Sequence, residues 1–260
     1  MCDLIHAWRD WVAAGASGVL PGDEALLDRP DLTCHFSNWQ EFVESHEWAA
    51  KSKRIHLGLT PTPYVGCLEH ARIFILLLNP GFTPLNYFAE YQVPGQREIH
   101  LDCIAQNAAN ARRGFHDLQP DSSWRGGFQY WHGKLSALAT QLTQSTGQSL
   151  PEAFDLIRRN LAIIELAPYH SATFGLPNSL LTQLRSVRLA QEYVRTVVAP
   201  RAINGDATII VTRRAKLWNI EPSERVVVYK GSESRGAHLG PTTRGGAAIL
   251  EALLGAAESG

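Results

Sequence analysis

Polar side chains of several kinds directly follow four short apolar segments of this 260-residue chain. The first segment runs into Asn79-Pro80-Gly81-Phe82, and the second into Glu165-Leu166-Ala167-Pro168-Tyr169-His170-Ser171. The third is followed by Arg213, Arg214 and Lys216, and the fourth by Ser232, Ser234, Arg235, His238 and Leu239. Amides, carboxylates, imidazoles and cations are the groups that orient water, move protons and bind phosphate. We therefore expect these segment ends to form one polar site, although Asn79-Pro80-Gly81 alone is also a common turn.

The four apolar segments are predicted to be β-strands buried on both faces, because none of them alternates apolar with polar residues. They are Ile73–Leu78, Leu161–Leu166, Thr208–Val211 and Arg225–Tyr229. Helical patterns separate them at Trp131–Gly147, after Ser149, at Asn178–Val198 (ended by Pro200) and at Ala247–Leu254. This alternation predicts an α/β fold, a three-layer α/β/α sandwich around a four-stranded parallel sheet. In such sheets ligands bind beyond the carboxyl ends of the strands.

The remaining segments are predicted to surround this core within a single domain over residues 1–260. Residues 1–55 read as a helical addition, with one helix along Leu4–Val12 and a second after a capping box at Ser37-Asn38-Trp39-Gln40. Residues 82–130 show little periodicity and predict a loop-rich insertion, which in a compact domain is usually a binding surface.

Composition limits the partners and cofactors that we expect. The net charge is −1 and the pI is about 6.8, so contact with nucleic acid would need local basic patches. Cys2, Cys34, Cys67 and Cys103 lie more than thirty residues apart without a C-x-x-C pair, which predicts reduced thiols and no metal or other cofactor. Neither a signal peptide nor a run of about 18 apolar residues is present, so we expect a soluble, cytoplasmic monomer.

Three of the segment ends resemble motifs of the uracil-DNA glycosylase superfamily. The strand that runs into Asn79-Pro80-Gly81 resembles the first motif of its mismatch-specific and single-strand-selective branches. Glu165-Leu166-Ala167-Pro168-Tyr169 resembles their N-x-C-P-L motif, with Glu165 in place of the asparagine, and His238-Leu239 loosely resembles the last motif. The resemblance extends in topology over roughly residues 64–254 and is close only in the first motif. It implies a monofunctional DNA glycosylase that flips a base and excises it without a metal or a lysine Schiff base.

The resemblance implies a role for each candidate residue. Asn79 would position the attacking water, Gly81 would let the base approach the backbone, and His238 would stabilise the leaving base, with His170 as second candidate. Leu239 would wedge into the DNA stack, and a ring among Phe88, Tyr87 and Tyr91 would stack on the base. Phe82, Tyr169 and His170 complete the expected base-binding set. DNA contacts are expected from Ser171, Arg213, Ser232, Ser234, Arg235, Leu239 and Arg244. Packing, turn or surface roles are the alternatives at each position.

Glu165 departs from the superfamily pattern, and its side chain indicates which base the site would bind. A carboxylate only accepts hydrogen bonds, and the exocyclic amine of cytosine is a suitable donor. We therefore expect a cytosine-type base, such as glucosylated hydroxymethylcytosine of phage DNA, and a role in antiviral defence. Glu165 acting as general base, or anchoring Arg213, is the alternative for this residue. The alternatives for the protein are uracil or mismatch repair, a nucleoside or nucleotide N-glycosidase, and a non-catalytic nucleic-acid-binding module.

Overall fold

The computed structural model describes residues 3–49 and 52–258, and the chain divides into two compact units. The first unit comprises Met1–Tyr64, Leu78–Asn107 and Glu165–Tyr193. The second comprises Val65–Leu77, Ala108–Ile164 and Val194–Gly260. Cys2 lies outside the described residues, and Cys34, Cys67 and Cys103 are buried free thiols. None of the helices in the described ranges is long and apolar enough to cross a membrane.

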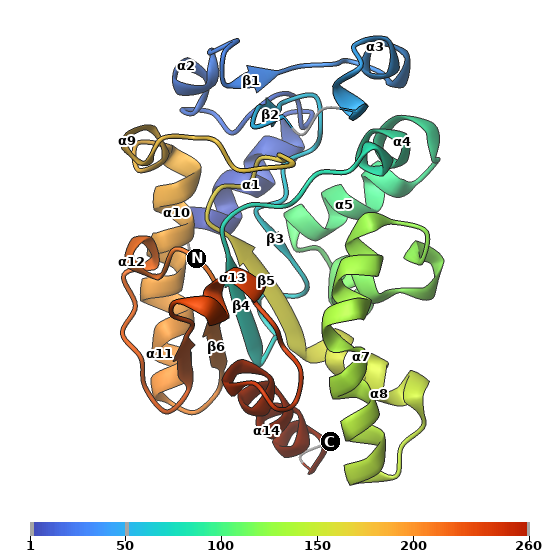
Figure 1. The fold of residues 1–260 in the computed structure, drawn as a ribbon, viewed down its shortest axis with the longest axis vertical. Coiled ribbons are helices and arrows are strands. Elements are labelled where there is room, and N and C mark those ends of the chain that lie inside the picture. Colours follow the sequence, from blue (N-terminus) through green and yellow to red (C-terminus); the bar gives the residue numbers. More distant parts are fainter. Residues whose placement is uncertain (1–2, 50–51, 259–260) are drawn as a thin grey trace. The chain divides into compact units, whose positions relative to one another are not determined.

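The first unit is mainly helical and carries one small parallel sheet. Its elements are α1 (Asp3–Ala13), α2 (Glu24–Leu27), β1 (Thr33–Cys34), α3 (Trp39–Glu44), η1 (Glu47–Ala49), β2 (Ile55–His56), α4 (Pro84–Gln92), α5 (Gln96–Ala105), α9 (Asn178–Leu181) and α10 (Arg185–Tyr193). Helix α1 buries Leu4, Trp8 and Trp11 and packs between α5 and α10 (Figure 1). Both helices predicted in residues 1–55 are therefore present, whereas α2 and the β1–β2 pair are additional. The cap of α3 is Asn38, whose side chain accepts from the Glu41 amide, one residue later than expected.

The second unit holds most of the main sheet. Its elements are β4 (Ile73–Leu77), α6 (Ala108–Arg113), η2 (His116–Leu118), η3 (Pro120–Ser122), α7 (Gly126–Thr146), α8 (Leu150–Asn160), β5 (Leu161–Glu165), the π-helical turn η4 (Val194–Val198), α11 (Ala199–Ile203), β6 (Thr208–Val211), α12 (Ala215–Trp218), β7 (Val226–Val228), α13 (Ser232–Gly236) and α14 (Arg244–Glu258). Helices α7, α8 and α14 pack together, and both α11 and α14 contact β6 (Figure 1). The mixed α/β class is as predicted.

The main sheet has five strands, in the order β3-β5-β4-β6-β7, one more than expected. The four predicted strands are all present, and β4–β6 and β6–β7 pair in parallel, with Ile75 opposite Ile210 and Ile210 opposite Val227. The additional strand, β3 (Tyr64–Val65), has two residues, too few to produce a periodic pattern. The long apolar runs in β4, β5 and β6 follow from their burial on both faces.

Two predicted segments differ from the structure. Residues 82–130 are not loop-rich, since they contain α4, α5, α6 and two short 3-10 helices before α7 begins. Their periodicity was hidden because the buried faces include polar residues such as His100 and Asn110. The helix predicted over 178–198 is divided into α9, α10 and η4, and Pro200 lies in the first turn of α11 instead of ending a helix. Proline is tolerated there because the first turn has no intrahelical amide bond to lose.

Candidate functional site

The side chain of Asn79 is fixed at the point where the first predicted strand ends. The Leu78 carbonyl accepts from the Ala167 amide at 2.9 Å, so the two segment ends lie side by side, as predicted. Asn79 Nδ2 donates to Pro80 O at 2.8 Å, Ser171 Oγ at 3.0 Å and Tyr169 O at 3.4 Å. Backbone carbonyls only accept, so the NH₂ group must face them. Oδ1 is directed away from these partners, and within the described residues no group donates to it.

His170 and Ser171 are buried and lie within hydrogen-bond distance of the Asn79–Gly81 turn. Ser171 is 2% exposed and bonds to Asn79, so its hydroxyl faces the turn rather than the surface at which DNA would bind. His170 is also buried; Nδ1 lies 2.9 Å from Gly81 O, and Nε2 lies 3.2 Å from Thr60 O and 3.1 Å from Thr62 Oγ1. His170 therefore connects the Asn79–Gly81 turn to the 60–62 segment as a positioning residue.

The aromatic candidates separate into core and surface residues. Tyr87 is fully buried and stacks on Phe42 at 4.2 Å between ring centroids, so its ring face is occupied by the core. Phe82 is half-buried and stacks on His56 at 3.8 Å. Phe88 is 38% exposed and meets Trp39 edge to face, which leaves it as the accessible ring.

Gly81 is exposed, and the chain itself does not need a glycine there. Its φ lies outside the left-handed region, and a Cβ built on it would meet nothing within 4 Å. Open space beside the backbone at this turn is what the approach of a ligand requires.

Tyr169 and Glu165 both lie in the interior of the first unit. Tyr169 donates to Asp23 Oδ2 at 2.6 Å and accepts from the Leu20 amide at 3.2 Å, so its hydroxyl is engaged within the protein. Burial, followed by the Asp23 carboxylate, holds the Tyr169 pKa well above its usual value. Glu165 is 3% exposed, and its backbone amide donates to Pro63 O at 3.0 Å.

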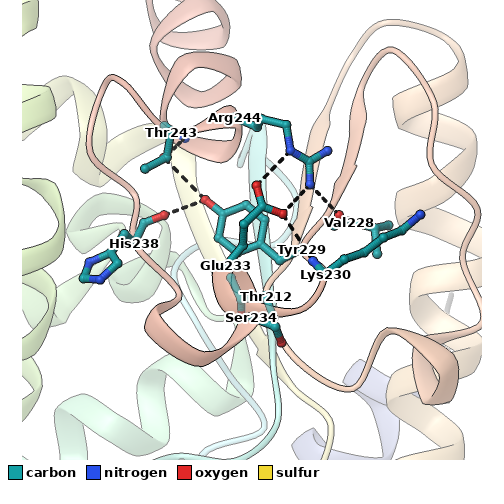
Figure 2. A network of polar contacts seen from close by, with 10 residues as sticks. Thr212, Val228, Tyr229, Lys230, Glu233, Ser234, His238, Thr243 and Arg244 are labelled. Carbon is teal, nitrogen blue, oxygen red and sulfur yellow. Dashed lines mark hydrogen bonds and ion pairs between the residues drawn. The ribbon is translucent and has the colours of Figure 1, made fainter.

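In the second unit, a hydrogen-bonded network joins the ends of β6 and β7 (Figure 2). Ser234 Oγ donates to Thr212 O at 2.8 Å, which holds α13 against the end of β6. Tyr229 Oη donates to His238 O at 2.5 Å and lies 3.4 Å from Thr243 Oγ1. These contacts bring the third and fourth predicted segment ends together within this unit and engage Ser234, one of the expected phosphate contacts.

His238 and Leu239 differ in exposure. The His238 imidazole is exposed and points away from the network in Figure 2, and within the described residues no group bonds to the ring. Leu239 is 2% exposed and belongs to the core. A wedge residue must reach the DNA stack, so Leu239 could act as one only if this loop moved when DNA bound.

The basic candidates of the second unit are unequally available. Arg244 bonds to both Glu233 oxygens, at 3.0 and 2.7 Å, and donates to Val228 O at 2.9 Å, so its guanidinium already has protein partners. The hydrogen bonds from Arg244 lower the Glu233 pKa to about 2. Arg213 and Arg235 are exposed and form no hydrogen bond or ion pair with any described residue, and Ser232 is also exposed at the first turn of α13.

Several residues of these sites were not predicted from the sequence. Thr60, Thr62 and Asp23 organise the buried side of the Asn79 turn, and Lys134 donates to Gly236 O and Ala237 O beside His238. None of them follows a predicted strand, so the strand-end rule could not find them. The Pro61 and Pro63 flanking Thr62 were the available signal of an ordered, non-helical segment.

Comparison with known proteins finds no family model, curated protein or solved structure that matches this chain.

Proposed function

We propose that this chain is a monofunctional DNA glycosylase with a three-layer α/β/α fold like that of the uracil-DNA glycosylases. The observation that carries the proposal is the state of the Asn79 side chain. Its amino group is committed to Ser171 and two carbonyls, which leaves Oδ1 as a fixed acceptor at the end of a rigid buried strand. A fixed neutral acceptor orients a water molecule without removing its proton beforehand.

The reaction needs little more than this orientation and a stabilised leaving group. The water oxygen attacks C1′ of the deoxyribose, the C1′–N bond breaks, and the base leaves with the bonding electron pair and takes up a proton. Asn79 Oδ1 accepts a hydrogen bond from the water and so directs its lone pair toward C1′. An error of about 1 Å in such positioning costs roughly 100-fold in rate, so the Ser171 hydrogen bond that holds Asn79 contributes to catalysis.

The surroundings of Gly81 suit a flipped base. The space beside its Cα lets a base lie against the backbone, and Phe88 offers an exposed ring. Base–aromatic stacking contributes about 1–3 kcal/mol, comparable to the cost of extruding a nucleotide.

Glu165 supports a cytosine-type base in preference to uracil. Its carboxylate accepts hydrogen bonds only, which matches the donor amine of cytosine and opposes the acceptor-rich edge of uracil. Glucosylated hydroxymethylcytosine of phage DNA belongs to this class, and its excision would serve antiviral defence. The burial of Glu165 means that the base would enter fully below the protein surface to reach it.

The second unit offers groups for the leaving base and for DNA. The exposed His238 imidazole has ring nitrogens that can form hydrogen bonds with a base. Arg213 and Arg235 are free of protein partners among the described residues and can bind phosphates.

Base release from defined oligonucleotides tests the proposal. Single- and double-stranded DNAs carrying uracil, a thymine mismatch, hydroxymethylcytosine or glucosylated hydroxymethylcytosine are incubated with the protein, and alkali-labile abasic sites are counted. Asn79→Ala should lower the rate at least about 100-fold and Ser171→Ala about 10-fold, whereas Thr173→Ala, an exposed neighbour, should not. Glu165→Gln should change the preferred base. An Asn79→Ala variant as active as the parent would refute the assignment.

A nucleoside N-glycosidase is the second candidate, because Leu239, the residue expected to wedge into DNA, is buried, and a nucleoside hydrolase needs no wedge. The same assay with free nucleosides distinguishes the two. Faster cleavage of free nucleosides than of DNA would favour this alternative, and Asn79→Ala would abolish activity in either case.

A further inference from the structure

Three potential metal ligands meet at the small β1–β2 sheet of the first unit. The parallel register places Cys34 opposite His56, and Cys34 Sγ lies 3.4 Å from His56 Nδ1. Glu47, in the 3-10 helix η1, reaches the same place, and one ligand atom from each of the three residues lies within 4.8 Å of the others.

The separation of these atoms matches a tetrahedral zinc site. With Zn–S near 2.3 Å and Zn–N near 2.0 Å, two ligands at the tetrahedral angle lie about 3.5 Å apart. The observed distance of 3.4 Å between Cys34 Sγ and His56 Nδ1 already matches this value, so neither side chain would need to move. The carboxylate of Glu47 would close in by roughly 1 Å, a change that a glutamate side chain makes by rotation.

The carboxylate also has an unused, buried hydrogen-bonding atom. Within the described residues, Glu47 Oε2 is buried and has no hydrogen-bond partner. Buried polar atoms are normally paired, so an unpaired carboxylate oxygen beside a thiol and an imidazole calls for an explanation. Glu47 Oε1 is held by Arg54, which anchors the carboxylate from outside in the way that metal ligands are commonly supported.

A cavity of about 620 Å³ reaches two of the three residues. Its lining includes Cys34, Glu47 and Arg54. It can therefore supply a water molecule to the fourth position of a metal bound by three protein ligands.

We propose that Cys34, Glu47 and His56 bind a zinc ion with water as the fourth ligand, a site that the cysteine spacing did not predict. Nitrogen, sulfur and carboxylate donors in a tetrahedral arrangement are the ligand set of zinc. The inference does not depend on the glycosylase proposal. It adds to it, however, because the ring of His56 stacks on Phe82 and its amide donates to His170 O at 2.9 Å. The metal would thereby stabilise the turn that carries Asn79.

Burial shifts the pKa values of both Cys34 and His56, and a metal ion would have to compete with the proton of the thiol. Burial lowers the His56 pKa to about 4, so its ring is neutral and can coordinate. Burial also raises the Cys34 pKa to about 12, so the thiol does not act as a nucleophile near neutral pH. A metal ion would displace the thiol proton, which Cys34 now directs to Ile55 O at 3.6 Å.

Metal titration of the full-length chain tests the site. Chelator-treated protein is titrated with Zn²⁺ by calorimetry and with Co²⁺ by absorption spectroscopy, which reports a thiolate-to-cobalt charge-transfer band. We expect one ion per chain, a Kd of about 1 µM or tighter, and the charge-transfer band. Cys34→Ser should abolish the band and weaken Zn²⁺ binding at least about 100-fold, and Glu47→Gln should weaken it about 10-fold or more.

Cys67→Ser is the matched control, because Cys67 is also a buried free thiol but belongs to the other unit. It should retain both the band and the affinity. Absence of saturable Zn²⁺ binding by the parent protein, or equal binding by Cys34→Ser, would overturn the proposal. Circular dichroism checks each fold, and if Cys34→Ser is unfolded, unchanged Zn²⁺ affinity in Glu47→Gln decides against the site.

Discussion

At the scale of single residues, the type of residue 79 matters as much as its place. An asparagine satisfies the carbonyls of Pro80 and Tyr169 with its amino group and still presents an oxygen. An aspartate in the same position would direct a second carboxylate oxygen at those carbonyls, and the two acceptors would repel each other. The turn therefore selects the amide, which is the side chain that the proposed water-positioning role requires.

Gly81→Ala should separate function from stability. A Cβ at Gly81 meets nothing within 4 Å and the backbone is not left-handed, so the free energy of unfolding should change by less than about 0.5 kcal/mol. Base excision should nevertheless decrease, because the methyl group occupies the space proposed for the base. Urea unfolding and the abasic-site assay on the same preparation measure both effects.

Gly66→Ala is the contrasting variant. Gly66 has φ +97°, and a Cβ there would collide with the backbone of Leu161 and Ala162. It should destabilise the fold by about 1–3 kcal/mol. Should Gly81→Ala be destabilised to the same extent, Gly81 has a structural role and its proposed part in base binding is wrong.

At the scale of elements, the sequence predicted the strands well because burial on both faces leaves uninterrupted apolar runs such as Thr208–Val211. It also placed the Asn79 and Ser171 segments side by side, since parallel strand ends share an edge. It could not predict which way each loop side chain faces. Tyr169 turns inward because Asp23, far away in sequence, accepts a hydrogen bond from its hydroxyl, and Leu239 turns inward with the core. Such choices depend on tertiary packing.

The 3-10 helix η2 should give the fold a measurable acid sensitivity. It packs against α7 and α8. Burial lowers the pKa of its His116 from 6.5 to about 4. The charge of Asp117 acts in the opposite direction and raises this pKa, whereas Arg125 and Arg113 lower it slightly further. The unfolded chain binds this proton near pH 6.5, so the contribution to stability is complete above that pH and is lost as pH falls toward 4. Between pH 6.5 and 4, the free energy of unfolding of the parent should decrease by about 2–3 kcal/mol more than that of His116→Gln.

Urea unfolding at a series of pH values measures this difference as a slope, so any constant cost of the substitution cancels. His35→Gln, at an exposed position, should keep the slope of the parent. If His116→Gln also kept it, the folded protein would be taking up the proton at the ordinary pKa, contrary to the burial of η2.

At the scale of the whole molecule, the net charge of −1 provides no long-range attraction to DNA. Binding must instead use individual cations. A cation that is already bonded to protein groups is less available to phosphate. Arg244 is exposed in the structure, but its guanidinium is held by Glu233 and Val228 O. Arg213 and Arg235 have no such bonds among the described residues. Counting arginines therefore overstates the surface available to phosphate.

The salt dependence of DNA affinity should show this difference. Each phosphate contact contributes roughly 0.9 to the slope of log K against log salt concentration, because binding releases a condensed counterion. Arg213→Gln and Arg235→Gln should each reduce the slope by about 1. Arg244→Gln should change it little, since that guanidinium would have to leave Glu233, whose pKa of about 2 keeps it charged at any working pH. Fluorescence anisotropy with a labelled oligonucleotide over a salt series measures all three. Equal losses for the three variants would show that Arg244 exchanges Glu233 for phosphate when DNA binds, and unchanged slopes for Arg213→Gln and Arg235→Gln would remove both residues from the DNA-binding surface.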